Sequence, residues 1–216
     1  MHTQHTLAQT IDHTILKPDC TEEQVRTLCN EANEYGFASV CVLPCWVELS
    51  SSICSNVCTV VGFPLGANTT QTKVSEAIDL IGLGAKEIDM VACITALKSG
   101  NIHHVQSDIS AVVNAVHKRG GMVKVIIETC LLTDSEKRVM CELVSVAGAD
   151  FIKTSTGFST GGATVDDVEL LRKHVPPHVQ VKASGGVRDR ATAIAMIEAG
   201  ATRIGTSSGK VIVAEP

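Results

Sequence analysis

Aromatic side chains are scarce in this 216-residue chain, where Phe, Trp and Tyr together make up 3% of the residues. Such a chain offers few platforms on which nucleic-acid bases could stack. Positive charge is also in short supply, because 23 acidic residues outnumber 18 basic ones and leave a formal net charge of −5 at pH 7. Neither feature suits a nucleic-acid partner, and we expect none.

Long apolar runs are missing as well. No run approaches the roughly 18 to 20 residues that a membrane-spanning helix needs. The first residues, MHTQHTLAQTIDHT, lack the basic segment followed by an apolar stretch that marks a secretory signal. We therefore expect a cytoplasmic protein with no membrane partner.

The nine cysteines do not form a disulfide pattern. Their number is odd, no Cys-x-x-Cys pair occurs, and several lie inside apolar runs such as SVCVLPC. Disulfide frameworks belong mainly to short exported chains. We expect free thiols that mostly pack as small apolar side chains.

Eight short apolar runs alternate with stretches of helical periodicity along the chain. Thr21, Thr133 and Thr164 precede helical stretches with acidic first turns, as N-caps do, and glycines follow the ends of five such stretches. The apolar runs lie at 7–12, 37–43, 57–63, 85–91, 121–128, 149–155, 179–184 and 201–207. The helical stretches lie at 21–35, 69–83, 101–119, 134–147, 164–174 and 189–199, with a further short helix expected within 45–55.

This alternation predicts an α/β fold with a parallel sheet. Closure into a (β/α)8 TIM barrel, forming a single domain over residues 1–216, fits eight strand–helix units best. A doubly wound open sheet is the alternative. No G-x-G-x-x-G motif follows the first apolar run, which argues against the dinucleotide-binding form of that fold.

The face of each strand that should point into the barrel is unusually polar. Side chains alternate between the two faces of a strand, and the apolar set should face the helices. The remaining, inward set contains Thr10, Asp12, Glu87, Asp89, Lys124, Ile126, Glu128, Phe151, Lys153, Gln180, Lys182 and Ser184. Buried charges must be paired or keep contact with solvent. A polar core network is one reading, but three inward lysines favour an active site at the C-terminal ends of the strands.

Lys153, at the end of the run ADFIKTS, is the candidate covalent catalyst. A lysine at its ordinary pKa of about 10.4 is protonated at neutral pH and is no nucleophile. Desolvation and a nearby cation, here Lys182, both lower the pKa of an amine. A neutral amine can attack a carbonyl and form a Schiff base, which eases the making or breaking of a neighbouring C–C bond. Asp89 is the carboxylate best placed for the proton transfers.

Glycine- and hydroxyl-rich segments follow the late strands: TSTGFSTGGAT, SGGVRD and GTSSG. TIM barrels commonly bind phosphate with the loops after strands 7 and 8, where free backbone amides favour an anion. Gly185, Gly186, Ser207 and Ser208 lie in those two loops. Glycine and serine are also ordinary turn residues, but two consecutive loops of this kind favour a phosphate site.

Three further residues are candidates for contact with a metal or a substrate. His13 adjoins Asp12, but no second histidine accompanies it at the spacing of a metal site, so we expect no metal. Cys41 ends the second predicted strand and could reach the site, although a packed thiol is the simpler reading. Arg188 could contact a phosphate or simply be solvated at the start of a helix.

The chain resembles the 2-deoxyribose-5-phosphate aldolases, a class I aldolase family. The resemblance spans nearly the whole sequence, through IDHTILKPD, SVCV, VVGFPLG, EIDMV, KVIIET, FIKTSTGFSTGGAT, VKASGGVRD and RIGTSSG. It implies a (β/α)8 barrel that reversibly cleaves 2-deoxyribose 5-phosphate to acetaldehyde and glyceraldehyde 3-phosphate, in deoxyribonucleotide catabolism. It further implies no metal, no organic cofactor, and a homo-oligomer, either a dimer or a tetramer.

The resemblance also assigns roles by motif. Lys153 of IKTSTG would form the Schiff base, Lys182 of VKASGG would lower its pKa, and Asp89 of EIDMV would exchange protons through water. The sugar and phosphate would be held by Thr156, Gly157, Gly186, Ser207 and Ser208. Asp12 and Lys124 would complete the polar network.

Two departures from the family pattern bear on rate or selectivity. Leu43 precedes Pro44 where the family often has Asn, and the final segment GKVIVAEP lacks a C-terminal tyrosine tail found in some members. Three other functions stay open at this point. They are a Schiff-base aldolase for another phosphorylated sugar, a non-catalytic barrel that binds a phosphorylated metabolite, and a metal-dependent barrel aldolase.

Overall fold

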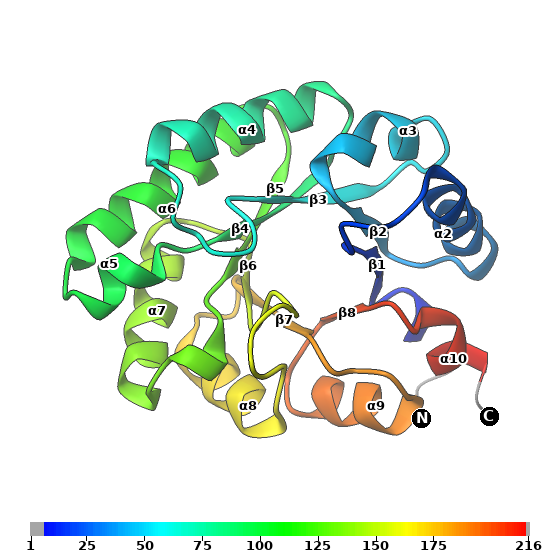
Figure 1. Ribbon diagram of the computed structural model, residues 1–216. Coiled ribbons are helices and arrows are strands. Elements are labelled where there is room, and N and C mark those ends of the chain that lie inside the picture. The colour runs from blue at the N-terminus through cyan, green and yellow to red at the C-terminus, as the bar shows by residue number, and fades with distance from the viewer. Residues whose placement is uncertain (1–6, 215–216) are drawn as a thin grey trace.

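Eight parallel strands form one closed barrel in the computed structural model, which describes residues 7–214 (Figure 1). Each strand pairs with its neighbours in sequence, and β8 pairs with β1 to close the ring. The strands are β1 Ile11–Ile15, β2 Ser39–Val42, β3 Val57–Val61, β4 Glu87–Val91, β5 Met122–Ile126, β6 Phe151–Lys153, β7 Gln180–Ser184 and β8 Arg203–Thr206. The predicted (β/α)8 barrel is confirmed, and the open-sheet alternative is wrong.

Helices surround the barrel and cover the outer face of the sheet (Figure 1). They are α2 Glu22–Tyr35, α3 Val47–Ser51, α4 Thr70–Gly82, α5 Ile94–Lys98, α6 Ile102–His117, α7 Asp134–Val146, α8 Val165–His174, α9 Arg190–Glu198 and α10 Gly209–Ala214. Two 3-10 turns, η1 Pro44–Trp46 and η2 Thr129–Leu131, complete the order. The predicted helices agree with the observed ones to within a few residues at each end.

The helix starts follow from the capping residues. Thr21 and Thr133 form capping boxes. The threonine hydroxyl accepts from the backbone amide three residues later, and the side chain of that later residue accepts from the backbone amide of the threonine. Thr164 accepts from the amide of Asp167 in the same manner. These bonds satisfy amide groups that the first helical turn leaves without partners, so each helix begins at a defined residue.

The first strand begins later than its sequence pattern indicated. The run 7–12 was predicted as a strand, but Leu7 and Ala8 lie in a helical turn and Thr10 donates its hydroxyl to the Leu7 carbonyl at 2.8 Å. The apolar residues Leu7, Ala8 and Ile11 recur at spacings that also fit a helical turn, and this ambiguity misled the prediction. The short helices α5 and α10 were not predicted, because one or two turns carry too little periodicity to be recognised.

The main apolar core lies between the sheet and the helices. Ile88, Met90, Val125 and Ile152 are fully buried in this layer, on the strand faces that point outward. Their neighbours along the strands point into the barrel and carry the charges. The alternation of faces therefore places the polar residues inside the ring, as predicted.

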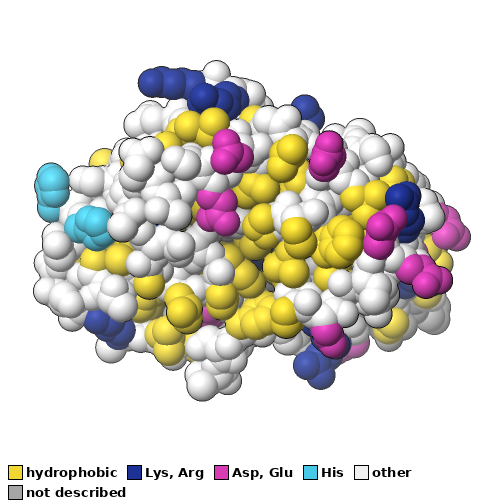
Figure 2. Space-filling view, turned by 45° about the horizontal axis from the view of Figure 1, so that its top comes forward, with side chains coloured by type: hydrophobic (Ala, Val, Ile, Leu, Met, Phe, Trp, Pro, Cys, Tyr) yellow, Lys and Arg dark blue, Asp and Glu magenta, His cyan; other side chains and the backbone are white. Residues whose placement is uncertain are grey.

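No helix within residues 7–214 is both long and apolar enough to cross a membrane. Figure 2 shows one face of the molecule, where apolar side chains gather across the middle and Lys and Arg side chains stand nearer the margin. Among the described residues visible on that face, the basic side chains do not join into one continuous patch.

Candidate active site

Lys153 is the last residue of β6, at the C-terminal end of the barrel. Its side chain is almost completely buried, and Nζ donates to Oδ2 of Asp89 at 2.7 Å. Lys153 also lines a cavity of about 790 Å³ that opens between the loops at this end. It is therefore a buried amine at the floor of a space large enough for a small substrate.

Lys182 lies beside Lys153, because the two residues are register partners on β7 and β6. Its Nζ donates to the same oxygen, Asp89 Oδ2, at 2.8 Å, and also to Oδ2 of Asp12. Burial opposes the charge of Lys182, but the carboxylates of Asp12 and Asp89 overcome it, so the pKa of Lys182 lies above its ordinary value. Lys182 is thus a fixed cation next to Lys153.

Lys124 on β5 completes the set of inward lysines. Its Nζ lies 2.8 Å from Asp89 Oδ1, 2.5 Å from Glu87 Oε2 and 3.7 Å from Asp12 Oδ2. Burial opposes its charge, but the facing carboxylates, Asp89 first among them, raise its pKa well above the ordinary value. Lys124 is fully buried and does not line the cavity.

Asp89 and Asp12 are ionised at the centre of this network. Burial opposes ionisation of Asp89, but the three surrounding ammonium groups hold its pKa well below the ordinary value. The pKa of Asp12 is also lowered, because Lys182, Lys124 and the Arg203 guanidinium together overcome the effect of its burial. Ser39 donates a further hydrogen bond of 2.7 Å to Asp12 Oδ1. Each carboxylate is therefore saturated by donors.

Arg203 belongs to the network although the sequence analysis did not single it out. Nη1 lies 2.6 Å from Asp12 Oδ1 and 3.0 Å from Glu87 Oε2. The guanidinium also stands 5.4 Å from the centre of the Phe151 ring, which forms the apolar base beneath these charges. The sequence did offer a signal for Arg203. The apolar Ile204 faces the helices, and because side chains alternate along a strand, its neighbours Arg203 and Gly205 must face into the barrel.

The network contains one more cation than carboxylates among the described residues. Its cations are Lys124, Lys153, Lys182 and Arg203, and its carboxylates are Asp12, Glu87 and Asp89. Lys153 contacts a single carboxylate, whereas each of the other cations contacts at least two. The charge of Lys153 is therefore the least compensated of the four.

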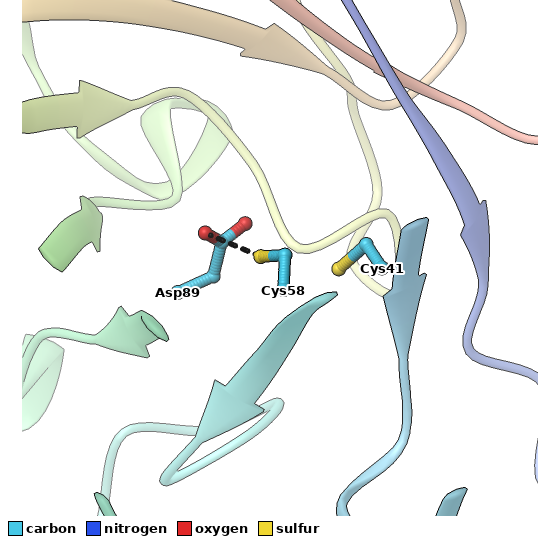
Figure 3. A group of neighbouring side chains, drawn as sticks. All are labelled: Cys41, Cys58 and Asp89. Atoms are coloured by element: carbon cyan, nitrogen blue, oxygen red, sulfur yellow. Dashed lines mark hydrogen bonds between the residues drawn. The ribbon is translucent and has the colours of Figure 1, made fainter. Parts of the chain in front are cut away.

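Cys41 and Cys58 reach the same network from β2 and β3 (Figure 3). The two residues are register partners, and both side chains are fully buried. Cys58 Sγ donates to Asp89 Oδ1 at 3.1 Å and accepts from Lys124 Nζ at 3.3 Å. Cys41 was predicted to pack in the interior. It does so, in a small buried cluster against which Leu43, the residue after β2, also packs.

Two groups of side chains could in principle ligate a cation. Sulfur and oxygen atoms of Cys41, Cys58 and Asp89 lie within 4.8 Å of one another, and so do those of Asp12, Cys58 and Glu87. Lysine ammonium groups already bind the carboxylates of both groups, and their positive charge opposes a second cation at short range. The carboxylates of both groups therefore act as ion-pair partners of the lysines.

The wall of the cavity is formed by loops that follow the late strands. It includes five of the predicted binding residues: Thr156, Gly157, Gly185, Gly186 and Ser207. Arg188 lines it as well. Ser208 is not among the lining residues, and its amide instead donates to Thr206 Oγ1 at 2.9 Å. Gly185 and Gly186 have φ of 81° and 83°, a conformation that other residues adopt at a cost.

His13 lines the cavity and is held in place by two contacts. Its Nε2 lies 2.8 Å from Glu31 Oε2, and its ring packs 4.9 Å from that of Phe37. Burial, which outweighs the opposing effect of Glu31, lowers the pKa of His13. The imidazole is a member of neither candidate cation group described above.

A parallel barrel with a buried lysine at the floor of its C-terminal cavity has the arrangement that a Schiff-base aldolase of the TIM-barrel class requires. The chain belongs to the DeoC/LacD family of aldolases, whose family model matches residues 6–215. The family resemblance noted in the sequence is therefore confirmed.

Relatives and solved structures agree with this assignment. A deoxyribose-phosphate aldolase from Brevibacillus brevis is 58% identical over 207 residues, covering 94% of this chain and 93% of that protein. One from Listeria monocytogenes is 59% identical over 212 residues, covering 96% and 95%. A tetrameric deoxyribose phosphate aldolase from Aeropyrum pernix superposes with a TM-score of 0.93 at 35% identity, covering 99% of this chain and 92% of that one.

Proposed function

We propose that this protein is a class I aldolase that reversibly cleaves 2-deoxy-D-ribose 5-phosphate to D-glyceraldehyde 3-phosphate and acetaldehyde. The observation that carries the proposal is the position of Lys153. It is the one inward lysine of the network described above that lines the cavity, and its charge is the least compensated. The names of the relatives support the choice of substrate.

The first step forms a bond between Lys153 and the substrate. Neutral Lys153 Nζ attacks the C1 aldehyde of the open-chain sugar, and loss of water leaves an imine. Lys182 keeps its proton because two carboxylates hold it, so a fixed positive charge stands beside the amine that reacts.

The second step breaks the bond between C2 and C3. The protonated imine accepts the electron pair of this bond, while the C3 hydroxyl loses its proton and becomes the aldehyde of glyceraldehyde 3-phosphate. The enamine that remains on Lys153 takes a proton at C2, and water then releases acetaldehyde. Asp89 lies 2.7 Å from Lys153 Nζ, which places a carboxylate where it can relay these protons through water.

The phosphate would lie against the loops after β6, β7 and β8. Gly157, Gly185, Gly186 and Ser207 line that wall, and Arg188 adds a positive charge. Backbone amides of glycine loops bind anions without a dedicated cation. Assembly into a dimer or tetramer, a cytoplasmic location and a place in deoxyribonucleotide and carbohydrate degradation stay predictions.

Trapping the imine tests the proposal directly. Borohydride added with acetaldehyde should reduce the imine and leave an N-ethyl group on Lys153, located by peptide mass spectrometry. Lys153→Ala should lose both the adduct and essentially all turnover. An adduct on Lys182 or Lys124 in the wild-type protein would show that the roles are misassigned.

The choice of substrate needs a separate assay. Release of acetaldehyde should be measured over a panel of phosphorylated sugars, with 2-deoxyribose 5-phosphate as the expected best substrate. A clearly higher kcat/KM for another phosphorylated sugar would leave the proposed Schiff-base mechanism standing but refute 2-deoxyribose 5-phosphate as the substrate. Activity that disappears on treatment with a chelator would instead support a metal-dependent aldolase.

A further inference from the structure

Glu128 has an unusual backbone conformation at the C-terminal rim of the barrel. It follows β5 by two residues and has φ 51° and ψ 67°, in the left-handed region. Within residues 7–214 it is the only residue other than glycine with a positive φ. A side chain with a Cβ is disfavoured there, and such a conformation persists where surrounding contacts fix it.

The hydrogen bonds to the Glu128 carboxylate come from one residue, Thr156, while the Glu128 backbone carbonyl accepts from the amide of Leu131 at 3.0 Å. Glu128 Oε1 accepts from the amide of Thr156 at 3.2 Å, and Oε2 accepts from the Thr156 hydroxyl. The carboxylate is 4% exposed, and no ion pair among the described residues includes it. A buried carboxylate without a cation depends on its hydrogen-bond donors, so Glu128 and Thr156 require each other.

Thr156 uses its hydroxyl twice within the protein. Its proton goes to Glu128, and its oxygen accepts the amide of Phe158 at 3.0 Å. The hydroxyl and amide of Thr156 are therefore already engaged, although the resemblance assigned Thr156 to substrate binding. Among the described residues the amide of Gly157 has no acceptor, which leaves it available to a bound anion.

Gly157 stands where two loops of the cavity wall meet. Its Cα lies 3.7 Å from the position that a Cβ on Gly185 would take. Ser184, just before Gly185, fixes the first part of the loop after β6, because its hydroxyl donates to the carbonyl of Ser155 in that loop at 2.6 Å. The loop after β6 is thus held on one side by Ser184 of β7 and on the other by Glu128, which follows β5.

We propose that Glu128 is a positioning residue that sets the anion-binding wall of the cavity through Thr156. It does not line the cavity, so it acts on the substrate only through the loop 154–158. By fixing Thr156 it fixes the position of Gly157 relative to Gly185 and to Lys153, which lies four residues before Gly157. This role rests on the proposed aldolase function, and it separates phosphate recognition from the chemistry at the lysine.

Glu128→Gln tests the role while keeping the volume of the side chain. The amide oxygen can still accept from the Thr156 amide, but the NH2 group cannot accept the Thr156 hydroxyl proton. Glu128→Ala removes both acceptors. We expect KM for 2-deoxyribose 5-phosphate to rise several-fold in the first variant and about tenfold or more in the second, as expected for lost hydrogen bonds to a charged group.

The same variants should retain the chemistry. Activity on unphosphorylated 2-deoxyribose should stay within about threefold of wild type, and borohydride with acetaldehyde should label Lys153 to the wild-type extent. Asp150→Ala is a matched control, because Asp150 also accepts a backbone amide, that of Val123 at 2.8 Å, at the other end of β5. It should leave the KM for the phosphorylated sugar unchanged.

Equal losses with both sugars, or wild-type KM in Glu128→Ala, would overturn the proposal. Amide hydrogen exchange at Thr156 and Phe158, whose amides donate to Glu128 and to the Thr156 hydroxyl, gives a readout that does not depend on the reaction. It should be faster in Glu128→Ala than in the Asp150 variant. Unchanged exchange there would refute the role of Glu128 even if the wild-type protein proved inactive on deoxyribose 5-phosphate. Inactivity of the wild type, by contrast, would refute the proposed function alone.

Discussion

Lys153 and Lys182 direct their ammonium nitrogens at one carboxylate oxygen, Asp89 Oδ2, at distances of 2.7 and 2.8 Å. The oxygen joins the lysine that lines the cavity to the lysine that is sealed beneath it. A change in the charge of either lysine is therefore felt by the other through Asp89.

Asp89→Asn should reduce turnover and also lower the stability of the barrel, because it removes the carboxylate that three buried lysines share. The amide keeps the shape of the side chain but removes the negative charge and the ability to relay protons. We expect kcat to fall by about 10²- to 10⁴-fold, the range typical of a lost general acid or base. Steady-state kinetics and circular dichroism check both parts. A kcat within a few-fold of wild type would remove Asp89 from the mechanism.

Lys182→Leu should harm both activity and stability. Removing this lysine leaves Asp12 and Asp89 buried without their shared cation, which typically costs about 3–5 kcal/mol of unfolding free energy. Turnover should fall about 10²-fold or more, while the phosphorylated substrate still binds. Urea denaturation and ligand titration measure the two effects. Lys210→Leu breaks the exposed pair with Glu31 and should leave both quantities near wild type.

The stability of the protein should fall in acid because of these same carboxylates. Asp12 and Asp89 have lowered pKa values in the folded state, so the unfolded chain binds protons first as the pH decreases. Their contribution is present above the unfolded pKa of about 3.9 and is lost as the pH falls below it. Unfolding free energies measured from pH 6 to pH 3 should therefore decrease.

A variant of one carboxylate checks the origin of that decrease. In Asp12→Asn the dependence of unfolding free energy on pH should be shallower by up to about one proton. The variant will also be less stable at neutral pH, so the slope is the informative quantity. Identical slopes in the two proteins would mean that other groups produce the acid sensitivity.

The barrel and the inward lysines were predictable from the sequence because they depend on periodicity. Eight apolar runs at regular intervals imply eight strands, and alternation along each strand puts Lys124, Lys153 and Lys182 on one face. Parallel strands then bring the ends of β6 and β7 together. Each of these steps uses a local pattern that tertiary contacts do not change.

The remaining features depend on contacts between distant residues. Arg203 reaches Asp12 across 191 positions, and Cys58 contacts Asp89 across the β3–β4 pair. The partnership of Glu128 with Thr156 requires a left-handed backbone that no local pattern indicates for glutamate. Ser208 fell outside the cavity wall because the turn before α10 directs its amide to Thr206. Side-chain partners of this kind follow from the register and loop geometry of the closed barrel.

Gly205 on β8 provides the space that Lys182 occupies. A Cβ at this position would lie 2.9 Å from the Cβ of Ser184 and 3.0 Å from Cε of Lys182, closer than packed carbon atoms normally approach. Gly205→Ala should push the lysine away from Asp89, so we expect lower kcat together with a lower melting temperature.

Gly82→Ala is the control for this substitution. Gly82 is the last residue of α4, and an added Cβ would meet no atom within 4 Å. Alanine there reduces the freedom of the unfolded chain and suits a helix, so stability should rise by about 0.4–1 kcal/mol with kcat unchanged. If Gly205→Ala behaved like Gly82→Ala, the position of Lys182 would not depend on the absence of a Cβ at residue 205. Its contact with Asp89 would then be set by the carboxylates alone.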